Sequence, residues 1–209
     1  MMFKDRRDAG RRLAEALKEY ENTDGIVLAI PRGGVVVADE VASFLNLPLS
    51  LIIPRKIGAP GNPELAIGAT AGSGKLVLNE EVIKYLNVSE EYIERATRKE
   101  NAEIKRREND YLQGKEIPNT EGKIVILIDD GIATGSTAEA AILAVKSNNP
   151  QKTVLAVPVA PPETIKRLSR EADEVVILQM PEYFYAVGQF YETFTQTTDE
   201  EVIGILKKY

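Results

Sequence analysis

Two adjacent carboxylates followed by a short loop rich in hydroxyl groups are the side chains best suited to chemistry in this sequence. Asp129 and Asp130 follow an apolar run at residues 124–128 and precede a loop with two glycines and three hydroxyl side chains. In a strand-to-helix turn of this kind, main-chain N–H groups surround a concavity, and the start of the helix adds partial positive charge. The pattern predicts a phosphate site. Its loop consists of Ala133, Thr134, Gly135, Ser136 and Thr137.

The acidic pair needs a partner other than phosphate, because two carboxylates repel a bare phosphate group. Carboxylates accept hydrogen bonds from sugar hydroxyls, as the acidic residue of dinucleotide-binding folds does for ribose. The acids and the loop together therefore favour a ribose 5-phosphate. The alternative is an ordinary capped helix, since Ser136 and Glu139 have capping-box spacing. Capping explains neither the acidic pair nor the density of hydroxyls, and it is compatible with binding.

A Walker A phosphate loop is the main competing motif, and the sequence does not match it. Residues 129–137 contain no lysine, and the Gly-Ser-Gly-Lys run at residues 72–75 has Ala69 where the first glycine belongs and Leu76 after the lysine. A nucleotide-binding phosphohydrolase or kinase is therefore the least supported function.

Composition narrows the chemistry further. The chain has 209 residues, a net charge of -6 from 26 basic and 32 acidic side chains, and no His, Cys or Trp. The missing residue types exclude a serine–histidine triad, a cysteine nucleophile, imidazole acid–base catalysis and disulfides. They also exclude zinc sites built from thiolates or imidazoles. Any metal is expected to be a hard, oxygen-ligated cation such as Mg²⁺.

Charge and hydropathy indicate the setting in which the protein works. The acidic balance argues against a broad nucleic-acid surface, which normally carries surplus Lys and Arg. No apolar run approaches the roughly 18 residues that cross a bilayer, and the charged N-terminal segment lacks the apolar core of a signal peptide. We therefore expect a single-domain, cytoplasmic globular protein that binds neither nucleic acid nor membrane.

The segments that must position the site alternate between strand and helix. Short apolar runs predict buried strands at residues 26–30, 49–53, 123–129, 153–159 and 174–178. Helices are predicted at residues 5–20, 35–45, 138–146, 162–171 and from Thr198 onward. This alternation predicts an α/β fold, a parallel twisted sheet with helices on both faces. Ligands of such sheets bind beyond the carboxyl ends of the strands, where residues 31–34, 54–56 and 129–137 are expected.

Two further regions are less regular. The glycine-rich residues 57–74 predict a loop with one short strand near residues 66–70 and a hairpin partner at 75–78. Residues 79–111 predict helix. Within residues 89–113, seven acidic and six basic side chains favour a solvated helical face over a binding surface.

Residues 124–137, IVILIDDGIATGST, resemble the phosphoribosyl pyrophosphate (PRPP) signature of type I phosphoribosyltransferases. Two other segments strengthen the resemblance. Residues 30–34, IPRGG, resemble the pyrophosphate loop of the family, and residues 54–56, PRK, are similar to the Arg-Lys run of adenine-type members. The resemblance spans residues 25–160, and the whole sequence resembles an uncharacterised branch of predicted phosphoribosyltransferases.

The resemblance implies a role for each matching residue. Asp129 and Asp130 would hold the ribose hydroxyls and, directly or through water, Mg²⁺. Residues 133–137 would hold the 5-phosphate. The pyrophosphate would be held by Arg32, Gly33, Gly34, Arg55 and Lys56. Arg55, Lys56 and Asp130 would be the catalytic residues. The alternative for Arg55 and Lys56 is an ordinary exposed basic pair after a strand.

The implied reaction displaces pyrophosphate from C1 of the sugar by a nitrogenous acceptor, a nucleobase in most of the family. Its oxocarbenium-like transition state needs electrostatic stabilisation and positioning rather than a histidine or a protein nucleophile. The alternative is a non-catalytic regulator of the same fold that senses PRPP or a nucleotide.

The family also implies a particular domain organisation. A core at residues 25–179 would carry a hood made from residues 1–24 and 180–209, with a helical insert at residues 79–113. Tyr183, Phe184 and Tyr185 would form the acceptor pocket, unless the hood aromatics serve only packing. Family habit implies a homodimer. The insert and residues 61–64 depart from the best-known members, which leaves open the acceptor base and the loop that acts as a lid.

Overall fold

A five-stranded parallel sheet forms the centre of the protein. The computed structural model describes residues 2–71 and 76–209. The strands are β1 (Gly25–Ala29), β2 (Leu49–Leu51), β6 (Ile124–Ile128), β7 (Lys152–Val159) and β8 (Glu174–Gln179), in the order β2-β1-β6-β7-β8. All neighbours pair in parallel. The apolar runs therefore predicted every strand of this sheet.

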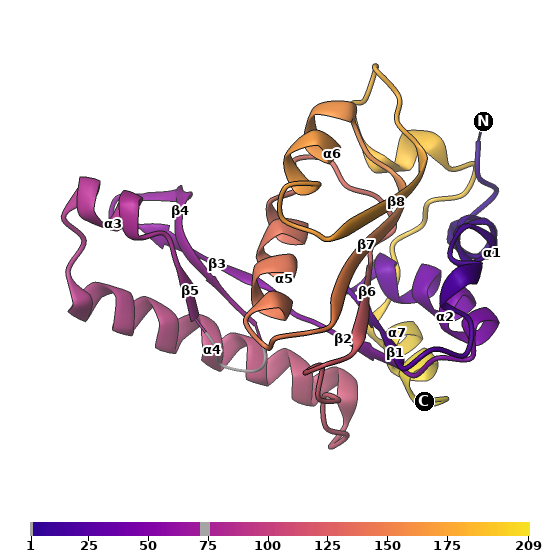
Figure 1. Cartoon of the computed structure of the whole chain (residues 1–209), viewed down its shortest axis with the longest axis horizontal. Helices are drawn as coiled ribbons and strands as arrows, with labels where there is room; N and C mark the ends of the chain where they lie inside the picture. Colours follow the sequence, from indigo (N-terminus) through magenta and orange to yellow (C-terminus); the bar gives the residue numbers. More distant parts are fainter. Residues whose placement is uncertain (1, 72–75) are drawn as a thin grey trace.

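Helices cover both faces of the sheet (Figure 1). One face packs against α1 (Arg6–Ala16), α2 (Gly33–Leu45) and α7 (Asp199–Leu206), and the other against α5 (Ser136–Lys146) and α6 (Pro162–Leu168). Successive strand residues alternate between the two cores: Val27 and Ile126 belong to the first, and Leu28 and Leu127 to the second. Both faces are buried, which explains why the strands read as unbroken apolar runs. The predicted fold class is confirmed.

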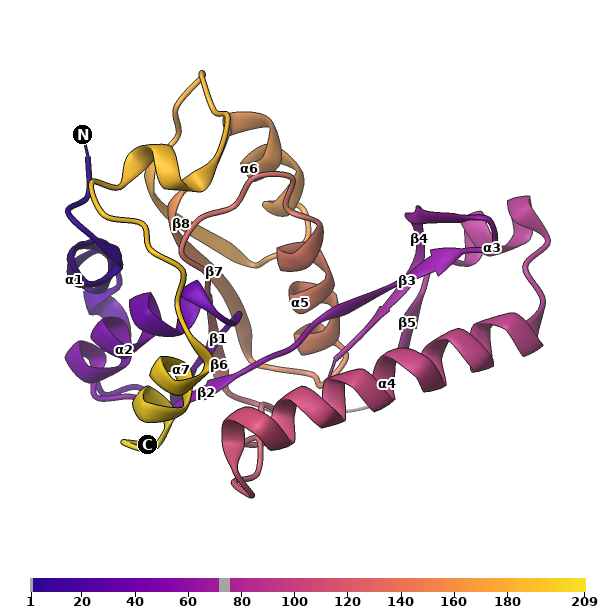
Figure 2. The same cartoon turned by 180° about the vertical axis from the view of Figure 1, so that it is seen from behind.

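An arm projects from the β2 edge of the sheet (Figures 1 and 2). It consists of a three-stranded antiparallel sheet, β3 (Arg55–Ala59), β4 (Asn62–Thr70) and β5 (Leu76–Leu78), with the helices α3 (Glu80–Leu86) and α4 (Glu90–Leu112). Its strands and α4 share a small core of their own, which includes Ile57, Ile67 and Ile93. The long charged helix predicted from the sequence is present as α4.

The loop predicted for residues 57–74 is wrong, because most of this stretch is strand. Its glycines allow close packing rather than breaking the sheet. A Cβ on Gly58 would lie 2.6 Å from the Cα of Pro63, and one on Gly68 would lie 2.6 Å from the carbonyl oxygen of Val77. Residues 72–75, which include the Gly-Ser-Gly-Lys run and the first residue of the predicted hairpin partner, lie outside the described residues.

The continuous helix predicted for residues 79–111 is two helices. Asn87 ends α3 in the left-handed conformation, with φ of 50°, and Ser89 caps the start of α4 through a hydrogen bond from the N–H of Tyr92. The remaining helices begin and end close to their predicted positions. For example, Thr198 caps α7 by accepting from the N–H of Glu201.

The N-terminal segment lies beside the segment that follows β8. A parallel bridge joins Phe3 to Tyr191, and the N–H of Phe3 donates to the carbonyl of Phe190 at 2.8 Å. The rings of Phe3 and Tyr191 are 5.3 Å apart, and Phe194 lies 4.9 Å beyond Tyr191. The short 3₁₀ helices η1 (Lys18–Tyr20) and η2 (Val187–Phe190) complete these segments. Among residues 2–71 and 76–209, no helix has both the length and the apolar surface to cross a membrane.

Candidate functional site

The acidic pair and the predicted pyrophosphate loop meet at the carboxyl end of the sheet. Asp129 and Asp130 follow β6, and Gly33 and Gly34 begin α2 after the neighbouring strand β1. A Cβ on Gly33 would lie 1.9 Å from Oδ2 of Asp130, and a Cβ on Gly34 would lie 2.8 Å from the carbonyl oxygen of Ile128. At Gly34 the main chain leaves no room for a Cβ, and at Gly33 a Cβ would displace the carboxylate of Asp130. The peptide bond between Pro31 and Arg32 is cis.

The predicted phosphate loop, residues 133–137, offers a row of unused hydrogen-bond donors. Gly135 adopts a left-handed conformation, with φ of 77°, and α5 begins at Ser136. Within the described part of the chain, the main-chain N–H groups of residues 133–137 donate no hydrogen bond. The hydroxyls of Thr134, Ser136 and Thr137 likewise make none with any described residue. We call residues 133–137 the anion loop, because free N–H groups at a helix start are an anion site.

The capping-box alternative for this loop is wrong. The N-cap of α5 is Gly135, which has no side chain, and Ser136 is the first residue of the helix. The carboxylate of Glu139 does not return to the helix start but pairs with the guanidinium of Arg167 on α6. The N–H groups at the start of α5 are therefore left for another partner.

Arg6, a residue that the sequence reasoning did not select, binds the acidic pair. Its Nε donates to Oδ2 of Asp130 at 2.7 Å, and its Nη1 donates to the carbonyl of Thr195 at 2.7 Å. The guanidinium lies 3.9 Å from the centre of the Phe194 ring. The side chains of Arg6 and Asp130 are only 11% and 14% exposed, so the pair is well shielded from water. One feature of the sequence could have identified Arg6. It lies seven residues, or two helical turns, before Leu13, so it is on the same side of α1 as the apolar stripe.

Tyr191 is a second missed residue. Its hydroxyl donates to the main-chain carbonyl of Asp130 at 2.5 Å. Burial, together with the charge of Asp130, raises the pKa of Tyr191, so the phenol stays protonated and remains a donor. Nearby, Val187 of η2 packs against Gly131, where a Cβ would lie 2.4 Å from a Val187 methyl. The C-terminal segment therefore fixes the backbone that carries the acids.

The two carboxylates differ in their surroundings. Burial and the adjacent charge of Asp130 raise the pKa of Asp129 well above its ordinary value. The N–H of Asp130 donates to Oδ1 of Asp129 at 2.8 Å, and the charge of Arg6 is nearby; both oppose the rise. The ionised form of Asp129 is therefore held at a cost to the free energy of folding.

This cost predicts that Asp129→Asn is more stable than the wild-type protein near neutral pH. A carboxyl whose pKa is higher in the folded than in the unfolded chain destabilises the fold increasingly as the pH rises above the unfolded value, and the loss is complete above the folded pKa. The penalty disappears below the unfolded value of about 3.9. Asn is neutral at every pH, and its Oδ1 still accepts from Asp130. Denaturation midpoints measured from about pH 7.5 down to about pH 4 test this, since the advantage of the variant is expected to shrink as the pH falls. An advantage that is constant with pH, or absent, would contradict it.

Two of the three predicted leaving-group cations, Arg55 and Arg32, form ion pairs with acidic side chains. Arg55 lies 3.5 Å from Glu100 and 3.4 Å from Glu103, both on α4. Lys56 is half-buried and pairs with Ala69 across the arm sheet. Arg32 lies 3.6 Å from Asp199 at the start of α7. The structure therefore brings the backbone of residues 32–34 to the acidic pair, whereas Arg55 is held by the arm.

The three aromatic residues predicted for the acceptor pocket separate into two kinds. Tyr183 and Tyr185 are 77% and 88% exposed. Phe184 instead packs against Phe190, with ring centres 5.3 Å apart. The packing alternative thus holds for Phe184, and the two tyrosines extend into solvent.

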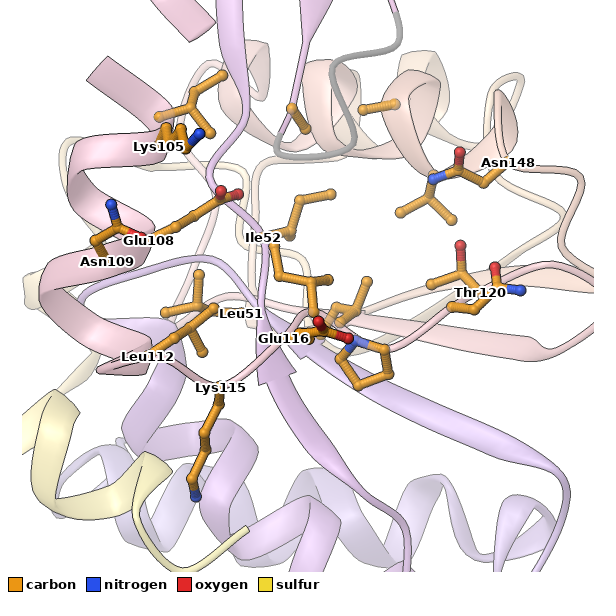
Figure 3. Close-up of a pocket in the computed structure, with 18 of the residues that line it drawn as sticks. Leu51, Ile52, Lys105, Glu108, Asn109, Leu112, Lys115, Glu116, Thr120 and Asn148 are labelled. Carbon is orange, nitrogen blue, oxygen red and sulfur yellow. The ribbon is translucent and has the colours of Figure 1, made fainter. Parts of the chain in front are cut away.

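A separate cavity of about 660 Å³ lies between α4 and the sheet. Figure 3 shows Lys105, Glu108 and Leu112 of α4 on one side and Thr120 and Asn148 on the other. Burial raises the pKa of Glu108, and among the described residues its Oε1 and the hydroxyl of Thr120 have no hydrogen-bond partner. Its lining does not include the acidic pair or the anion loop. The candidate site is therefore identified by the free N–H groups of the anion loop and the two adjacent carboxylates, and not by the size of a cavity.

Comparisons with known proteins identify the family of this chain. A family model described as the phosphoribosyl transferase domain matches residues 3–194. Relatives from two Mycobacterium tuberculosis strains, CDC 1551 and H37Rv, carry a provisional phosphoribosyl transferase name. They are 42% identical over 207 residues, which is 99% of this chain and 47% of theirs. The chain thus spans about half the length of these curated relatives.

Solved structures extend the comparison. The TT1426 protein of Thermus thermophilus is 44% identical with a TM-score of 0.92, covering 100% of this chain and 99% of that one. The AQ2163 protein of Aquifex aeolicus, 16% identical with a TM-score of 0.52 over 88% of this chain and 78% of that one, shares the fold. With its parallel sheet, acidic pair and anion loop, and with the family model matching most of its length, the chain belongs to the phosphoribosyl transferase domain family.

Proposed function

We propose that the protein binds PRPP with Mg²⁺ and transfers the phosphoribosyl group to a nitrogenous acceptor, a nucleobase, with release of pyrophosphate. The observation that carries the proposal is the row of free N–H groups in the anion loop beside two carboxylates. The loop suits a phosphate and the acids suit a sugar diol, and PRPP has both on one ribose.

Each part of the site then has a role. Asp129 and Asp130 accept hydrogen bonds from the ribose hydroxyls, and residues 133–137 bind the 5-phosphate. The pyrophosphate lies against Arg32, Gly33 and Gly34, where the glycines let the backbone approach the anion closely. The bond from C1 to pyrophosphate breaks, a bond from C1 to the acceptor nitrogen forms, and the acceptor loses a proton.

The donor set suits Mg²⁺, which takes oxygen ligands and is commonly held by one or two carboxylates plus substrate phosphates. Asp129 and Asp130 would hold it directly or through water. Within the residues that the structure describes, no group of three or more acidic side chains could hold a metal by itself. Oxygens of PRPP would therefore complete the coordination. When bound, the ion neutralises charge on the departing pyrophosphate.

Arg55 and Lys56 are proposed to add positive charge near the leaving group. Arg55 must first part from Glu100 and Glu103, which tie it to α4. Both ion pairs are longer than 3.3 Å and only partly shielded, so separating them costs little, on the order of 1 kcal/mol.

The acceptor is proposed to lie under the segment after β8, where Tyr183 and Tyr185 are free to stack on a flat base. Cytoplasmic location and a homodimer complete the proposal, the first from the acidic, cysteine-free composition and the second from the habit of the family.

Pyrophosphate release from PRPP and Mg²⁺, measured across purine, pyrimidine and pyridine bases, tests the proposal. We expect release with at least one base and none without PRPP. Binding of PRPP without release for any base would favour the non-catalytic regulator. No binding of PRPP, measured by calorimetry on folded protein, would contradict both.

A further inference from the structure

Helix α6 lies against the outer side of the anion loop and donates two hydrogen bonds to it. The hydroxyl of Thr164 donates to the main-chain carbonyl of Ala133 at 2.8 Å. Nη2 of Arg167 donates to the next carbonyl, that of Thr134, at 2.5 Å. Neither residue belongs to the loop, and the two lie one turn apart on α6.

These two bonds decide which way the loop's N–H groups point. In a planar trans peptide the C=O and the N–H lie on opposite sides. Because α6 holds the carbonyls of Ala133 and Thr134 on its own side, the N–H groups of Thr134 and Gly135 must point away from it. They are two of the free donors of the anion loop.

The packing around Gly135 keeps the loop in this orientation. A Cβ on Gly135 would lie 2.7 Å from the methyl of Thr164 and 2.9 Å from Nη2 of Arg167. The loop is thus pressed onto α6. Thr164 is 9% exposed, so its hydroxyl has little access to water as a competing partner.

The charge of Arg167 is already engaged. Its Nη1 pairs with the carboxylate of Glu139, in the first turn of α5. A guanidinium that is neutralised by Glu139 and bonded to a carbonyl is arranged to hold backbone rather than to attract an anion directly.

We propose that Thr164 and Arg167 are positioning residues for the 5-phosphate of the substrate. They hold the carbonyls of Ala133 and Thr134 toward α6. The N–H groups of Thr134 and Gly135 therefore point at the phosphate. The inference rests on the proposed function, because it takes the 5-phosphate of the substrate as the partner of the free N–H groups of the anion loop.

The test compares Thr164→Val and Arg167→Met, each of which removes one donor, with Thr164→Ser, which keeps the hydroxyl. Lys166→Met is the matched control, since it removes a cation from the exposed side of the same helix. Calorimetry gives the Kd of ribose 5-phosphate and of pyrophosphate for each variant, and steady-state kinetics give KM and kcat for PRPP. Circular dichroism checks that each variant is folded.

Thr164→Val and Arg167→Met are each expected to raise the Kd of ribose 5-phosphate about tenfold, the effect of one well-placed hydrogen bond. The KM for PRPP is expected to follow, with little change in kcat and none in the Kd of pyrophosphate. Thr164→Ser and Lys166→Met are expected to match the wild type. A general loss of structure would instead weaken both ligands together, and that outcome would contradict a positioning role.

Glu139→Gln separates positioning from direct attraction. If the charge of Arg167 attracted the phosphate itself, freeing it from Glu139 would tighten ribose 5-phosphate. Positioning predicts no tightening. Unchanged Kd values in both Thr164→Val and Arg167→Met would overturn the inference while leaving the proposed function intact. A folded wild-type protein that binds neither ribose 5-phosphate nor PRPP would overturn the proposed function itself.

Discussion

Asp130→Asn is expected to weaken Mg²⁺–PRPP binding by about 100-fold, because it removes the charge that we propose holds the ribose hydroxyls. Hydrogen bonds to a charged group contribute about 1.5–3 kcal/mol each, and each 1.4 kcal/mol is about tenfold in affinity. Calorimetry with PRPP and Mg²⁺ measures the effect. Inorganic phosphate, which has no diol, is the matched ligand, and its affinity is not expected to fall. A variant that binds PRPP within threefold of the wild type would remove Asp130 from the ribose site.

The same substitution is expected to destabilise the fold, since Arg6 loses a shielded partner at 2.7 Å. Breaking one side of a well-buried ion pair costs about 3–5 kcal/mol, and this pair is slightly exposed, so a smaller loss is expected. Arg6→Gln in the Asp130→Asn background removes the stranded charge and is expected to recover part of the loss. Urea denaturation of both single variants and the double variant measures it.

Gly33→Ala is expected to abolish binding of PRPP and of pyrophosphate together, with losses of at least 100-fold. The new Cβ would lie 1.9 Å from Oδ2 of Asp130 and 2.8 Å from Nε of Arg6, so it drives the carboxylate away and separates the ion pair. One methyl group would thus disturb both the backbone proposed to bind pyrophosphate and the carboxylate proposed to bind ribose. Overpacking of this kind also costs about 1–3 kcal/mol of stability. Calorimetry with PRPP and with pyrophosphate, alongside thermal denaturation, tests both effects.

Gly204→Ala is the matched control for Gly33→Ala. Gly204 lies within α7, and a Cβ there would have no heavy atom within 4 Å. Replacing an open helical glycine by alanine stabilises a protein by about 0.5–1 kcal/mol. The control is therefore expected to be slightly more stable and to bind as the wild type does. Equal losses of binding in the two alanine variants would show that the effect of Gly33 is not local.

The parts of the fold and of the site that depend on residues close together in the sequence could be predicted from it. β1 and β6 read as apolar runs because each is buried on both faces. The anion loop and the acidic pair are contiguous, so their residue types could be interpreted together. The glycines of residues 57–74 misled the prediction, because Gly58 and Gly68 are required by close backbone neighbours inside the arm sheet rather than by turns.

The residues that were missed act on the site across long stretches of chain. Arg6 is separated from Asp130 by 124 positions and Tyr191 from it by 61, while Arg167 is 33 positions from Thr134. An arginine in a charged helix gives no sign of its eventual partner. Only the packing of α1, α6 and the segment after β8 onto the strand ends brings these side chains to the acids and the loop.

The contacts of Arg6 also determine when the site can be completed during synthesis. The anion loop depends on β6, α5, β7 and α6, which are consecutive in the sequence. Arg6, by contrast, bonds both Asp130 and the carbonyl of Thr195, and it rests on the ring of Phe194. Helix α1 leaves the ribosome long before Phe194 and Thr195, so these contacts of Arg6 form late, because closing so long a loop precedes any gain from its contacts. A growing chain can therefore order its anion loop before Arg6 reaches Asp130.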